Sequence, residues 1–121
     1  MKEDQLNIDE TSLSVDLSEA TEAVKAARFE DALNLLSIVL KDHPDNIDVL
    51  YLAAVSARYL KKFDDSKKYI EHLLFNAPDM GRAYQELGHL NRDMGDEEKA
   101  VVHYRQACEL NPALLAAWNS L

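Results

Sequence analysis

Apolar residues recur along this chain with the three- and four-residue spacing of amphipathic helices. Between Glu30 and Pro44, the apolar residues recur every three or four positions: Ala32, Leu33, Leu36, Val39 and Leu40. Such a stripe is typical of a helix with one buried face. Pro44 should end this helix, because proline lacks the backbone donor and clashes with the preceding turn.

A second stripe begins after Asn46 and leads into another pair of helices. Its members share the same spacing: Val49, Leu50, Ala53, Ala54, Ala57 and Leu60. Lys61 and Lys62 interrupt the stripe, and a further helix should run from Phe63 through Phe75. The same design returns around Gly95, which suits the C-terminal cap of a helix. The pattern predicts antiparallel helix pairs joined by short turns.

These pairs repeat with a period of 34 residues, as the prolines Pro44, Pro78 and Pro112 show. Small residues align at the same offset in two columns: Ala20, Ala54 and Gly88, and Ala32, Ser66 and Ala100. We therefore divide the chain into a flexible acidic tail (1–12), three units (13–46, 47–80 and 81–114) and the start of a truncated fourth unit (115–121).

The third unit carries a family resemblance. Tyr84-x-x-Leu87-Gly88, Ala100-x-x-x-Tyr104 and Pro112 resemble the tetratricopeptide repeat, in the order that this family shows. The resemblance implies an all-α fold: a right-handed superhelical array of antiparallel helix pairs, or α-solenoid. The first unit departs from the pattern with polar residues at Asp16 and Glu19, as suits a solvent-facing capping repeat. Asp16 and Glu19 also form a capping-box pattern, which would start the first helix later than the register implies.

The last residues match the beginning of a further repeat but not the rest of it. Leu115, Trp118 and Leu121 form an apolar stripe that the missing second helix of a fourth unit would cover. We expect this stripe to promote self-association, with a homodimer through the C-terminal end as the simplest arrangement, or to fray. The alternative is a natural C-terminus whose last turn caps the third unit and folds back on it.

Charge and composition narrow the function. The 121 residues carry a net charge of −9, concentrated near the N-terminus, which disfavours nucleic acid as a partner. There is neither a signal-peptide pattern nor an apolar run long enough to span a membrane, so we expect a soluble cytoplasmic protein that binds no membrane. Cys108 is the only cysteine, which excludes an intrachain disulfide.

No pattern of reactive residues indicates catalysis. The four histidines have neither metal-ligand spacing with one another nor cysteine partners, and the three glycines stand alone rather than in a phosphate-binding loop. Cys108 lies on an apolar helix side, where a structural thiol is expected. We expect no catalytic residue, no metal site and no cofactor, and therefore a protein that is not an enzyme.

The tetratricopeptide resemblance implies a concave groove lined by the first helix of each unit. Residues of the kinds that anchor peptides would lie there: Tyr51, Arg58, Tyr59, Arg82, Gln85, His89 and Arg92. The alternative is that these side chains pair along their own helix, Arg82 with Glu86 and His89 with Asp93.

One known mode of tetratricopeptide binding does not fit. Some members of the family hold the C-terminal carboxylate of chaperones with a lysine, asparagine and arginine clamp. The matching positions here are mostly unsuitable: Leu17, Thr21, Leu52, Arg82 and Glu86.

We therefore expect a non-catalytic protein–protein interaction module that binds a peptide or partner in its groove. A second resemblance supports an alternative. The stretch GRAYQELGHLNRDMGDEEKAVVHYRQACELNPALLAAWNSL is similar to the tetratricopeptide segment of some bacterial sulfotransferase-like proteins. It would make the chain the N-terminal accessory region of a larger bacterial enzyme, with the catalytic domain beyond residue 121.

Overall fold

The chain folds into helices throughout the part that the structure describes. The structure is a computed structural model that describes the backbone of residues 2–114 and the side chains from Leu13 to Leu114. The helices are α1 (Lys2–Lys25), α2 (Phe29–Asp42), α3 (Ile47–Tyr59), α4 (Phe63–Asn76), α5 (Gly81–Asp93) and α6 (Glu97–Leu110), followed by the 3₁₀ turn η1 (Pro112–Leu114). Residues 2–114 contain no strand, so the predicted all-α fold is confirmed.

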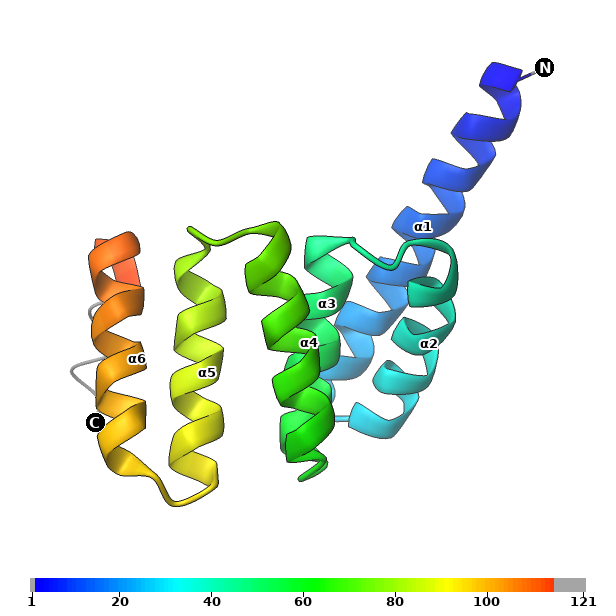
Figure 1. The fold of residues 1–121 in the computed structure, drawn as a ribbon. Helices are drawn as coiled ribbons and strands as arrows, with labels where there is room; N and C mark the ends of the chain where they lie inside the picture. The colour runs from blue at the N-terminus through cyan, green and yellow to red at the C-terminus, as the bar shows by residue number, and fades with distance from the viewer. Residues whose placement is uncertain (1, 115–121) are drawn as a thin grey trace.

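Successive helices are antiparallel and stand side by side in one extended array (Figure 1). The 34-residue period is visible in the backbone: α3 and α5 each have 13 residues, and α2, α4 and α6 each have 14. The turn inside each pair contains one residue with left-handed φ, at Ala27 (59°), Lys61 (63°) and Gly95 (86°). Gly95 therefore has the capping conformation that the sequence predicts.

Two polar caps fix helix starts. The side chain of Asn46 accepts a hydrogen bond from the backbone N–H of Val49 at 3.1 Å, and Asp96 accepts one from Lys99 at the same distance. These side chains satisfy backbone donors that the first turn of a helix leaves free. They place the beginnings of α3 and α6.

The core runs along the array as a series of small apolar clusters. The largest joins α1, α2 and α3 through side chains such as Leu36, Val49 and Ala53. Two more join α3, α4 and α5, one around Leu50, Leu73 and Ala83, the other around Ala54, Ile70 and Leu90. Tyr104 is buried against Gly88, where a Cβ would lie 2.8 to 3.0 Å from its ring atoms. The small residue at position 88 thus admits the ring.

The N-terminal segment differs from the sequence prediction. Residues 1–12 were expected as a flexible acidic tail, and the capping-box pattern at Asp16 and Glu19 suggested a late helix start. Instead, α1 is continuous from Lys2 to Lys25, and its first half projects away from the other helices (Figure 1). Helical hydrogen bonds are local, so a segment without glycine or proline can extend a helix with no apolar stripe to bury.

The C-terminal prediction falls outside the described residues. Leu115, Trp118 and Leu121 belong to residues 115–121, which the structure does not describe. Among the described helices, none combines the length and the apolar character needed to cross a membrane.

Candidate functional site

Arg58, near the C-terminal end of α3, joins the second unit to the third. Its Nε and Nη2 atoms donate to the two carboxylate oxygens of Glu86 at 2.8 and 3.0 Å, and Nη1 donates to Asp93 at 2.9 Å. The Arg58 side chain is only 6% exposed, and that of Glu86 is 4% exposed. Burial opposes the charge of Arg58, but the bonds to Glu86 outweigh it and raise its pKa. Arg58 is therefore committed to a buried ion pair within the fold.

Tyr59 follows Arg58 and lies over α2. Its ring stacks on Phe29 with centroids 4.4 Å apart and an interplanar angle of 2°, and the Arg58 guanidinium carbon lies 4.5 Å from the Tyr59 centroid. These contacts hold the ring in one orientation while 55% of the residue stays exposed.

His89 is joined to α6 rather than to Asp93. Its Nδ1 shares a hydrogen bond with the hydroxyl of Tyr104, and the two rings meet edge to face at 5.2 Å. Burial, helped by the positive charges of Arg58 and Arg92, lowers the pKa of His89 to about 4. The imidazole is therefore neutral near pH 7, and the alternative pairing of His89 with Asp93 is not observed.

Three of the expected groove residues, on α3 and α5, are partly or fully exposed to solvent. Tyr51 and Gln85 are half-buried, whereas Arg82 is exposed and makes no ion pair within the described residues. The alternative pair between Arg82 and Glu86 is not observed, because Glu86 binds Arg58. Burial raises the pKa of Tyr51, and the charge of Arg82 acts on the same hydroxyl in the opposite direction. We call Tyr51, Arg82 and Gln85 the α3–α5 face.

Arg92 lies apart from this face, at the end of the described array. Its side chain is 44% exposed and approaches Asp93 only to 3.6 Å. Arg92 borders a hollow of about 270 Å³ together with Glu97, Ala100 and Val101 of α6. The seven predicted groove residues thus divide between buried or packed positions, the α3–α5 face and the end of the array.

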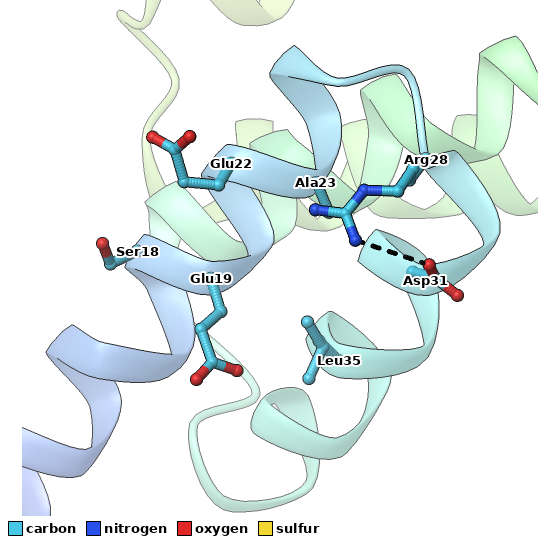
Figure 2. A pocket seen from close by; sticks show the side chains of 7 residues that line it. All are labelled: Ser18, Glu19, Glu22, Ala23, Arg28, Asp31 and Leu35. Carbon is cyan, nitrogen blue, oxygen red and sulfur yellow. Dashed lines mark ion pairs between the residues drawn. The ribbon is translucent and has the colours of Figure 1, made fainter.

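A further cleft of about 350 Å³ lies between α1 and α2 (Figure 2). It is lined by Ser18, Glu19, Glu22, Ala23, Arg28, Asp31 and Leu35. Its single basic side chain, Arg28, is 4.0 Å from Asp31, an exposed contact that contributes little free energy. The cleft is acidic like the surrounding N-terminal region.

No cluster of metal ligands accompanies these surfaces. Among the described residues, no three His, Cys, Asp or Glu side chains are grouped closely enough to hold a metal ion. Cys108 is half-buried and forms no disulfide.

Sequence reasoning missed the ionic partners of Arg58, although the repeat itself holds a signal. One period earlier, the positions of Arg58 and Glu86 are occupied by Val24 and Leu52, and both pack against the core shared by α1, α2 and α3. An arginine at a position that is apolar in the neighbouring unit indicates burial with a partner, since a buried charge requires one.

Comparisons with known proteins agree with this architecture. Residues 17–58 and residues 81–114 each match a family model described as tetratricopeptide repeat, and together they cover more than half of the chain. No curated protein matches the sequence closely.

Solved structures share the fold at low sequence identity. MamA MSR-1 has a TM-score of 0.73 and 24% identity, over 84% of this chain and 58% of that one. The first TPR domain of human RPAP3 has a TM-score of 0.76 and 19% identity, over 83% of this chain and 79% of that one. A structure of the first TPR of Spaghetti (RPAP3) bound to the HSP90 peptide SRMEEVD has a TM-score of 0.75 and 19% identity, over 83% of this chain and 79% of that one.

These likenesses establish the fold alone. The chain spans less than two thirds of the length of MamA MSR-1. None of the matches named here bears on the resemblance to sulfotransferase-like proteins, which stays a prediction from the sequence.

Proposed function

Because the chain belongs to the tetratricopeptide repeat family, whose domains are typically non-catalytic protein-interaction modules, we propose that it binds a peptide on the α3–α5 face. The ligand is an extended or helical segment with an acidic group beside an apolar anchor. Arg82 supplies the charge, Gln85 supplies hydrogen bonds, and Tyr51 supplies apolar area with a polar end.

The observation that carries this proposal is the state of Arg82. It is an exposed cation with no ion pair in the described chain, beside a half-buried tyrosine, on a protein with a net charge of −9. An acidic ligand would complement this local charge, and its affinity would fall as salt screens the interaction.

The peptide-bound RPAP3 domain supports the general class of ligand. Its HSP90 peptide SRMEEVD is acidic. The present chain, however, has Leu17, Thr21 and Leu52 where a chaperone clamp has lysine, asparagine or arginine. We therefore propose an acidic peptide but not a chaperone tail.

Selection from a displayed library of random dodecapeptides would test this function. We expect enriched peptides to carry Asp or Glu next to an aromatic or aliphatic residue, and Arg82→Glu to weaken their binding about tenfold or more. Lys41→Glu, the same charge change at an exposed site on α2, is the matched control and should leave affinity unchanged.

Either of two results would count against the proposal. Enriched peptides without acidic residues would remove the role of Arg82. Equal losses in the Arg82→Glu and Lys41→Glu variants would show that only the net charge of the protein matters.

A further inference from the structure

The repeat places three residues at one position of its 34-residue period, and the first two contact the unit that follows. These residues are Val24, Arg58 and Arg92, spaced by one period. Val24 packs in the core shared by α1, α2 and α3, to which Leu52 of the next unit also belongs. At the next junction, Arg58 instead receives the carboxylate of Glu86, which occupies the position of Leu52. This position therefore contacts the first helix of the following unit in both junctions.

Arg92 repeats the arrangement of Arg58 without the carboxylate. Arg58 is 6% exposed, whereas Arg92 is 44% exposed. Within the described residues, the carboxylate that comes nearest to Arg92 is that of Asp93 at 3.6 Å, beyond hydrogen-bonding distance, and the other oxygen of Asp93 is bound by Arg58. The guanidinium fork of Arg92 is thus available for a carboxylate from outside the described residues.

Val101 of α6, beside Arg92, is more exposed than the residue at the same position of the first unit. Ala100 and Val101 line the hollow next to Arg92, and they correspond to Ala32 and Leu33 of the first unit. Leu33 is 7% exposed in the core that includes α3, whereas Val101 is 38% exposed. The hollow therefore lies beside Arg92, at the position where Val24 and Arg58 contact the next unit.

We propose that this surface, formed by Arg92, Ala100 and Val101 and called the end face, docks an amphipathic helix of a partner protein. The helix carries a carboxylate with leucine or a similar residue one and four positions later. Its template is α5, in which Glu86 binds Arg58 while Leu87 and Leu90 pack in the cluster with Ile70. A bidentate bond to Arg92 would orient the helix, and the apolar side chains would fill the hollow.

Charge favours this partner over residues 115–121. Residues 115–121 read LAAWNSL and contain neither Asp nor Glu, so they offer no side-chain carboxylate to Arg92. Glu97 borders the same hollow and would repel an additional acidic residue on that side. The docked helix should therefore present its carboxylate to Arg92 and an apolar or basic residue to Glu97.

A capped peptide with the sequence of α5, GRAYQELGHLNRD, is the probe for this surface, compared with its Glu86→Gln version. Isolated helices of this length are marginal, so binding is measured by NMR titration, which suits weak affinity. We expect the wild-type protein to bind the glutamate peptide about tenfold more tightly than the glutamine peptide. The Arg92→Gln protein should bind both peptides equally weakly, and Arg92→Lys should restore part of the preference, because lysine keeps the charge without the fork.

The controls separate this surface from the other candidate sites. The Arg82→Gln protein should retain the preference for glutamate, and if it loses binding, the peptide occupies the α3–α5 face and the end-face proposal is wrong. Binding that appears only after Trp118→Ala and Leu121→Ala substitution would identify the chain's own C-terminal residues as the occupant and would equally overturn it. Library peptides selected on the α3–α5 face should be unaffected by Arg92→Gln, so the two proposals can fail independently.

Discussion

Replacing Arg58 with methionine should destabilise the protein by about 3–5 kcal/mol, because it leaves the Glu86 carboxylate buried and unpaired. The Glu86 side chain is 4% exposed and gives both oxygens to Arg58. Asp93 is 29% exposed, so water can replace its lost bond and its share of the cost is small. A domain of this size is stable by only about 5–15 kcal/mol, so the substitution should remove a large part of its stability.

The double variant Arg58→Met, Glu86→Leu should recover most of this loss. It gives the junction the apolar character that Val24 and Leu52 give to the first junction, with methionine chosen to fill the volume of arginine. Replacing a buried ion pair with apolar residues of similar volume is often neutral or stabilising by about 1–4 kcal/mol. We therefore expect the double variant to be at least as stable as the wild type.

Urea denaturation followed by far-UV circular dichroism, for wild type, both single variants and the double variant, measures this cycle. Arg92→Met is the matched control at the equivalent exposed position and should cost less than about 0.5 kcal/mol. A loss below about 1 kcal/mol for Arg58→Met would contradict the buried, unpaired state assigned to Glu86. A double variant no more stable than Arg58→Met would refute the reasoning that desolvated charge is the source of the cost.

Three smaller predictions test the packing, the turns and the buried histidine. Gly88→Ala should destabilise by up to about 2 kcal/mol in urea denaturation, since overpacking against Tyr104 outweighs the better helix propensity of alanine, and an unchanged midpoint would contradict the close approach. Gly95→Ala should lower the free energy of unfolding by about 1 kcal/mol, and Lys61→Gly should raise it by a similar amount, because both positions have left-handed φ, which glycine adopts without strain. A Cβ at position 95 would meet no neighbour, so the backbone conformation alone sets the cost there. Melting temperatures that shift in the same direction in both variants would contradict this explanation. Folding lowers the pKa of His89 to about 4, so the stability that the neutral imidazole contributes is fully present above its ordinary pKa of about 6.5 and is lost as the pH falls towards 4. The His89→Gln variant should therefore lose less stability than the wild type on acidification. Parallel urea titrations across this pH range would show the difference.

The helical period could be predicted from the sequence because every unit obeys the same packing rule. Small residues at Ala54, Gly88 and Ala100 permit close approach, and each is buried as expected. The turn at Gly95 was also predictable, since glycine adopts left-handed φ without strain. Such features depend on residues close in sequence or repeated at a fixed offset.

The candidate site was less predictable, because its side chains are governed by partners from other helices. Arginine is a residue type that often anchors ligands at a surface, yet Arg58 is buried in an ion pair with Glu86, which lies 28 residues away in the sequence. His89 was expected in the groove, with pairing to Asp93 along α5 as the alternative, but its hydrogen-bond partner is Tyr104 of α6. The helical first half of α1 was not predicted, for the opposite reason. Its backbone hydrogen bonds are local, so the helix forms there without the apolar stripe from which helices are predicted.

Mapping a library-selected acidic peptide onto the isotope-labelled full chain by NMR tests the central claim most directly, since it locates the ligand without any substitution. Binding on the α3–α5 face predicts that the largest chemical-shift changes occur at Tyr51, Arg82 and Gln85, and that they diminish as salt is added. Shift changes confined to α2, α4 and α6, or independent of salt, would contradict the account.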